Sequence, residues 1–190
     1  KEAYKQGDYN VENLSSLALK YYERGNDSLA AILYNQSLES KNLPLSLFYE
    51  AKYYLGSIEL KSENIDPLEN YIKNYTDSPF FKDALNQLLG YFKMSGLVDK
   101  EIQYFNTHLK YFSDDPWFLN QFAWRMSELD LYLPLALEKI NLALELINQN
   151  EQGIANIIDT KAEVLWKMGQ IDEAIITIEK AITMDAENKY

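Results

Sequence analysis

Residues 159–185 constrain the fold of this chain more than any other stretch. They read DTKAEVLWKMGQIDEAIITIEKAITMD, with apolar residues at helical intervals on both sides of Gly169. Ala162 and Ala174 stand where two antiparallel helix backbones must approach closely, and Gly169 supplies a turn conformation that other residues adopt at a cost. The seam between the helices is filled by larger residues, namely Leu165, Ile171 and Ile178. The stretch therefore predicts a helix–turn–helix hairpin.

The hairpin pattern recurs along the chain, at about residues 11–40, 45–77, 79–112, 116–148 and 153–185. The equivalent first-helix positions are Ala18, Gly56, Leu89, Ala123 and Ala162, with spacings of 38, 33, 34 and 39 residues. Length differences fall in the links between hairpins, apart from one extra residue near Asp130–Tyr132 in the fourth turn. All five prolines, at 44, 67, 79, 116 and 134, fall at helix starts, where a missing N–H costs nothing. We therefore expect an array over residues 11–190, with residues 1–10 as the ragged end of a preceding segment.

Two hairpins depart from the pattern. The second helix of hairpin two is expected to end about one turn early, at Tyr75–Pro79. In hairpin three, Glu101 takes the place that Ala174 has in the last hairpin.

These features resemble the tetratricopeptide repeat, a helical hairpin of about 34 residues. The residues that carry the resemblance are Ala162, Leu165, Gly169, Ile171, Ala174, Ile178, Ala181 and Ile182. The resemblance implies an all-α solenoid of ten helices in a right-handed superhelix, with a concave face lined by the first helix of each pair. Because such arrays usually bind other proteins, it also implies a non-catalytic scaffold that binds a protein or peptide in the concave groove.

Composition argues against several classes of function. The 190 residues include 29 acidic and 18 basic ones, for a net charge of -11. No nucleic-acid partner is expected, because phosphate binding needs clustered positive charge; a basic partner or simple solubility explains the acidity equally well. The absence of cysteine excludes disulfides, thiolate metal sites and thiol catalysis. No apolar run is long enough to span a membrane.

No catalytic, cofactor or metal site is expected. His108 is the only histidine and falls where the last hairpin has Ala181, so we expect its side chain to pack or snorkel. The sequence has no nucleophile elbow or phosphate-binding loop, and a metal would have to be held by carboxylates alone. An enzyme that uses groove carboxylates is the lowest-ranked hypothesis.

The candidate binding residues lie on the first helices, at positions that face away from the hairpin's own second helix. They are Asn86, Gln87 and Lys93 in hairpin three, Trp117, Asn120, Gln121 and Trp124 in hairpin four, and Asp159, Thr160, Glu163 and Trp166 in hairpin five. Side-chain amides can hydrogen-bond an extended peptide, and exposed rings offer a large contact area. The alternative is structural: Asn120 and Asp159 cap or brace a neighbouring helix, and Trp124 and Trp166 pack between repeats.

Some tetratricopeptide domains hold a partner's C-terminal carboxylate with lysines, asparagines and an arginine along the groove. The corresponding positions here carry Ser15, Leu19, Tyr53 and Ser57. These side chains cannot replace charge-assisted hydrogen bonds, so we do not expect a clamp of this kind.

Two further interpretations stay open. Residues 119–174, LNQFAW…DTKAEVLWKMGQIDEA, are similar to the tail that follows a thioredoxin-like domain in some bacterial proteins, which implies a structural or accessory domain of a larger protein. We expect a bacterial array, in the cytoplasm or the periplasm. Apolar faces at the terminal repeats offer a route to a homodimer.

Overall fold

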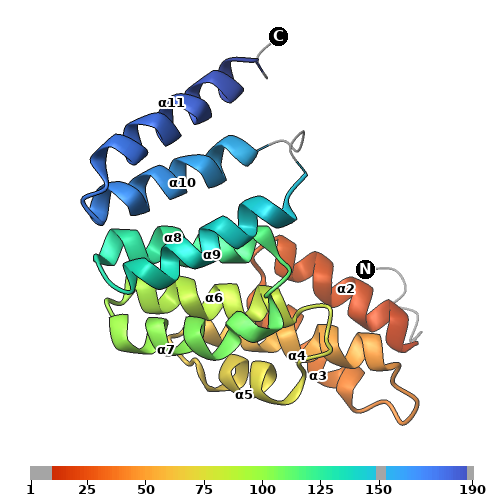
Figure 1. The fold of residues 1–190 in the computed structure, drawn as a ribbon. Helices are drawn as coiled ribbons and strands as arrows, with labels where there is room; N and C mark the ends of the chain where they lie inside the picture. The colour runs from red at the N-terminus through yellow and green to blue at the C-terminus, as the bar shows by residue number, and fades with distance from the viewer. Residues whose placement is uncertain (1–9, 149–152, 188–190) are drawn as a thin grey trace. The chain divides into compact units, whose positions relative to one another are not determined.

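The structure, a computed structural model, describes residues 10–148 and 153–187, and of residues 185–187 it describes the backbone alone. The ragged end predicted at residues 1–10 therefore lies outside the described residues except for Asn10. All the regular structure described is helical, which confirms the all-α prediction (Figure 1). The helices are α2 Val11–Glu23, α3 Asp27–Leu38, α4 Leu45–Leu60, α5 Asp66–Asn74, α6 Phe81–Met94, α7 Val98–His108, the 3-10 helix η1 Leu109–Tyr111, α8 Pro116–Leu129, α9 Leu133–Leu146, α10 Ile154–Lys167 and α11 Ile171–Glu187.

The chain divides into two compact units, Lys1–Glu101 and Ile102–Tyr190, and each is described by itself. In the first unit α4 packs on α2, α3, α5 and α6. In the second unit α10 packs on α8, α9 and α11, and α8 packs on α9. That the five hairpins form a single domain stays a prediction.

The turns inside the five helix pairs share one backbone geometry. Each contains a residue with positive φ, namely Gly25, Glu63, Gly96, Asp130 and Gly169. In each turn the next residue donates its N–H to the carbonyl five residues earlier: Asn26 to Tyr21, Asn64 to Glu59, Leu97 to Phe92, Leu131 to Met126 and Gln170 to Leu165, at 2.8–3.2 Å. This is the Schellman motif, which satisfies carbonyls left free at a helix end. The positive-φ residues are spaced as the predicted first-helix positions are, by 38, 33, 34 and 39 residues.

The extra residue predicted in the fourth turn is present. Helix α9 begins three residues after Asp130, whereas α11 begins two residues after Gly169. The added residue is Tyr132, which has a φ of 52°. A bulky residue in this region is uncommon, so the insertion is accommodated at a cost in backbone energy.

The short helix predicted in hairpin two is also confirmed, since α5 has 9 residues. Two tyrosines form hydrogen bonds with the segment that follows α5. Tyr49 Oη donates to Asp77 Oδ1 at 3.0 Å, and Tyr71 Oη bonds with Ser78 Oγ and with the carbonyl of Tyr49. These hydrogen bonds hold the link to α6 against α4 and α5.

No helix in the described part of the chain is long and apolar enough to cross a membrane. Among the same residues there is also no cluster of acidic and histidine side chains that could hold a metal ion.

Candidate partner-binding surface

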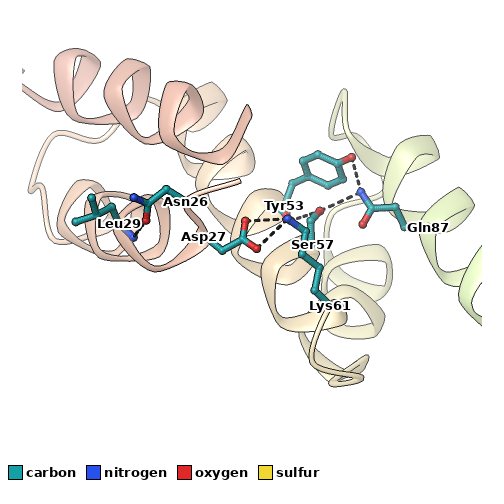
Figure 2. A network of polar contacts seen from close by, with 7 residues as sticks. All are labelled: Asn26, Asp27, Leu29, Tyr53, Ser57, Lys61 and Gln87. Atoms are coloured by element: carbon teal, nitrogen blue, oxygen red, sulfur yellow. Dashed lines mark hydrogen bonds and ion pairs between the residues drawn. The ribbon is translucent and has the colours of Figure 1, made fainter. Parts of the chain in front are cut away.

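Gln87 of α6 uses its side chain to hold the first unit together. Its Nε2 lies 2.7 Å from Tyr53 Oη and 3.0 Å from Ser57 Oγ, both on α4 (Figure 2). The side-chain N–H groups of Gln87 are therefore already engaged, which favours a bracing role over contact with a partner.

The other two candidates on α6 differ from Gln87. Asn86 is partly buried, and its Oδ1 has no hydrogen-bond partner among the described residues. Lys93 is exposed in the last turn of α6.

In the second unit, Asp115 fixes the start of α8. Its Oδ1 accepts hydrogen bonds from the backbone N–H of Trp117 at 3.1 Å and of Phe118 at 3.0 Å, as an N-cap does, and Pro116 takes the first helical position. The Trp117 ring lies against Gly153: a Cβ there would be 2.8 Å from Cη2 of the ring. Trp117 thus packs on the residue that precedes α10, although 37% of it stays exposed.

Asn120 and Trp124 stand one turn apart on α8. Asn120 Oδ1 is buried without a hydrogen-bond partner among the described residues, and Trp124 is 40% exposed. Gln121 beside them is partly buried. A buried amide oxygen that lacks a donor costs free energy.

The four candidate residues on α10 differ in their surroundings: one is buried and three border a pocket. Thr160 is buried, and its Oγ1 donates to the carbonyl of Asn156 at 3.0 Å. Asp159, Glu163 and Trp166 border a pocket of about 220 Å³. The remaining walls of this pocket are Ala162, Ile171, Ala174, Ile175 and Ile178 of α10 and α11.

His108 packs, as expected from its position. It is 9% exposed, its Nδ1 lies 2.7 Å from the carbonyl oxygen of Tyr104, and its ring contacts those of Tyr104 and Tyr111. Burial lowers the pKa of His108, because the charged imidazolium loses hydration.

The first unit contains a tyrosine cluster that the sequence did not predict. Tyr54 of α4 stacks on Tyr34 at 5.5 Å between ring centroids and lies 4.8 Å from Tyr22. Burial, with the Glu50 carboxylate nearby, raises the pKa of Tyr34, and burial raises the pKa of Tyr54 to about 12. Burial also raises the pKa of Glu50, although the Tyr34 hydroxyl, 3.5 Å away, opposes that shift.

A second missed feature is a larger polar pocket of about 560 Å³ in the first unit. Its lining residues include Asn35, Lys52, Asn64, Asn70 and Asn74. Several of them lie on the second helices α3 and α5, whereas all the predicted candidates are on first helices. The clustering of asparagines at 64, 70 and 74 was the available signal.

No family model and no curated protein matches the sequence. Solved structures do resemble it. A putative kinesin light chain from Podosopora anserina with nearly identical TPR-like repeats has a TM-score of 0.66 at 13% identity, covering 95% of this chain and 97% of that one. BtubC from P. vanneervenii gives 0.68 at 17% identity, covering 95% and 82%. YrrB, described as a TPR protein with an unusual peptide-binding site, gives 0.61 at 15% identity, covering 96% and 90%. With the repeated Schellman turns, this likeness shows that the chain has the tetratricopeptide-repeat-like fold.

Proposed function

We propose that this chain is a non-catalytic interaction module that binds a protein or peptide on the first-helix surface of its second unit. We define that surface by Asn120, Gln121 and Trp124 of α8 and by Asp159, Glu163 and Trp166 of α10. The fold supports this function, and so does the peptide-binding site for which the structurally similar YrrB is described.

One observation carries the proposal. The amide oxygen of Asn120 is buried without a hydrogen-bond partner among the described residues, one turn from the exposed ring of Trp124. An extended peptide could cover the ring with an apolar side chain and, with the Asn120 side chain turned outward, donate a backbone N–H to this oxygen. Gln87, Thr160 and Trp117 make intramolecular contacts and are assigned to bracing the fold.

Affinity capture from the source cells tests the proposal, with wild type beside an Asn120→Ala/Trp124→Ala double variant and bound proteins identified by mass spectrometry. A Glu145→Ala/Leu146→Ala variant is the matched control, because both residues are exposed on α9. We expect a partner that wild type and control retain and the double variant loses, with little change in the melting temperature of the double variant. Equal retention by all three proteins would place binding elsewhere and overturn the assignment.

A further inference from the structure

The pocket on α10 and α11 lies on an apolar face of hairpin five. In other hairpins of this chain a further helix covers the equivalent face. Trp166 is 53% exposed, Ile171 46% and Ile175 49%. Ala162 and Ala174 form part of the pocket wall between them. The same positions elsewhere in the chain show what kind of element fits there.

In hairpin one, which is formed by α2 and α3, the equivalent face is covered by α4. The equivalents of Trp166, Ile171 and Ile178, counted from the positive-φ turn residues, are Tyr22, Asp27 and Tyr34. Tyr54 of α4 contacts the rings of Tyr22 and Tyr34. Lys61, just past the end of α4, pairs with Asp27 at 2.8 Å (Figure 2). Its Nζ lies 4.6 Å from the centroid of the Tyr22 ring. The helix that covers this face thus brings a cation to the position equivalent to Trp166.

In hairpin two α6 covers this face. Its contacts show which side chain lies opposite the positions equivalent to Asp159 and Glu163. Tyr53 and Ser57 are the equivalents of Asp159 and Glu163. Both accept a hydrogen bond from one side chain, Gln87 of α6 (Figure 2). In hairpin five the two neutral acceptors are replaced by two carboxylates, which would favour a cation over an amide at the same place.

In hairpin four the covering helix is α10 itself, which packs on both α8 and α9. Hairpins one, two and four therefore each use a helix to cover this face. The face of hairpin five has an apolar floor and carries two carboxylates, Asp159 and Glu163, at its rim.

We propose that the α10–α11 face binds an amphipathic helix of a partner protein, with a lysine or arginine seated between Asp159 and Glu163 where α6 carries Gln87. Apolar residues on the same side of that helix cover Trp166, Ile171 and Ile175. The inference rests on the proposed interaction function and specifies the chemistry of the partner at the α10 end of the surface.

A second copy of this chain is a poorer occupant. A symmetric pairing of two α10–α11 faces would bring Asp159 and Glu163 of one copy towards the same carboxylates of the other, and like charges repel. A head-to-tail pairing would place α2 on the pocket. The exposed residues of α2 are all polar, namely Glu12, Asn13, Ser16, Lys20 and Glu23, so they offer no apolar ridge.

A peptide taken from the chain itself provides the probe. It reproduces residues 80–95, which include α6, carries a fluorescent label and is made in Gln87→Lys and Gln87→Glu forms. Fluorescence anisotropy with the full chain measures both affinities. We expect the lysine form to bind about tenfold more tightly or better, a ratio that matches one charge-assisted contact. An Asp159→Asn/Glu163→Gln variant should lose this preference.

Two neighbouring isoleucines give a matched pair of blocking variants. Ile175 lines the pocket and Ile176 does not, although both are exposed. Ile175→Glu should abolish peptide binding at an unchanged melting temperature, whereas Ile176→Glu should leave it intact. Equal affinity of the two peptides, no binding of either, or a preference that survives the loss of both carboxylates would overturn the proposal.

Two measurements separate this proposal from its alternatives. If sedimentation equilibrium finds a dimer that Ile175→Glu converts to a monomer, a second copy occupies the face and the heterologous-partner proposal fails. Loss of cellular capture by the Asn120→Ala/Trp124→Ala variant, together with no peptide preference in wild type, would leave the proposed function standing and reject only this inference.

Discussion

Gly56 and Leu68 pack so closely that a Cβ on Gly56 would lie 2.8 Å from Leu68 Cδ2. The two residues hold the first-helix and second-helix contact positions of hairpin two. At the same two positions the other small-residue hairpins have alanine pairs: Ala18 with Ala30, Ala123 with Ala136, and Ala162 with Ala174. Hairpin two therefore keeps its close helix contact by removing volume from α4 and adding it to α5.

Gly56→Ala should destabilise the protein, although alanine is the better helix former by about 1 kcal/mol. The new methyl group meets a leucine that is fully buried, and overpacking of this kind costs about 1–3 kcal/mol. Leu68→Ala should cost about 2–5 kcal/mol, because it leaves a cavity beside Gly56. Urea unfolding of both single variants and of the double variant measures the outcome.

The Gly56→Ala/Leu68→Ala double variant gives the decisive measurement, since it restores the alanine pair of the other hairpins. We expect it to be more stable than the sum of the single changes predicts, because the added methyl group fills part of the space that the leucine leaves. Strict additivity of the two changes would mean that the residues do not share a contact.

Sequence periodicity was sufficient for the register of the repeats because the residues that determine it are close in sequence. The turn glycines 25, 96 and 169 take positive φ, and the fourth turn holds its extra residue where the spacing predicted it. Glu63 and Asp130 adopt the same backbone region without being glycine, so composition alone could not identify them. The position of Gly56 was predicted as a close contact, but the leucine that requires glycine there was not.

The roles of individual surface residues were less predictable, because their partners are distant in sequence. Gln87 bonds to Tyr53 and Ser57, 34 and 30 residues earlier, and Trp117 packs on Gly153. Trp124 has the same kinds of polar and aromatic neighbours in the sequence. The sequence therefore does not show that Gln87 and Trp117 contact the rest of the chain and that Trp124 is exposed. Whether the candidates bind a partner stays a prediction.

Equivalent alanines in the last two hairpins should respond differently to enlargement. Ala136 is fully buried in α9, a helix that packs against α10, whereas Ala174 of α11 lines the open pocket. Ala136→Leu should cost about 1–3 kcal/mol of stability. Ala174→Leu should cost less, because the longer side chain can extend into the pocket. Thermal or urea unfolding compares them, and equal losses would show that the pocket does not accommodate the added atoms.

Buried tyrosines of the first unit should make the protein sensitive to alkaline pH. Burial raises the pKa of Tyr54 and of Tyr71 to about 12, whereas an unfolded tyrosine titrates near 10. Between about pH 10 and 12 the native chain holds protons that the unfolded chain has released, so stability should fall as the pH rises through this range and be fully present below it. Urea unfolding at several pH values measures the slope.

Tyr54→Phe should reduce that alkaline slope, because phenylalanine keeps the ring contacts with Tyr22 and Tyr34 and removes the ionisable hydroxyl. Tyr132→Phe is the control, since it removes an exposed phenol from the turn before α9 in the other unit. The ultraviolet absorbance of the phenolate follows tyrosine ionisation directly. If Tyr54→Phe leaves both the slope and the late part of the phenolate titration unchanged, ionisation of Tyr54 is not coupled to unfolding. The alkaline sensitivity then arises from other buried tyrosines of the first unit.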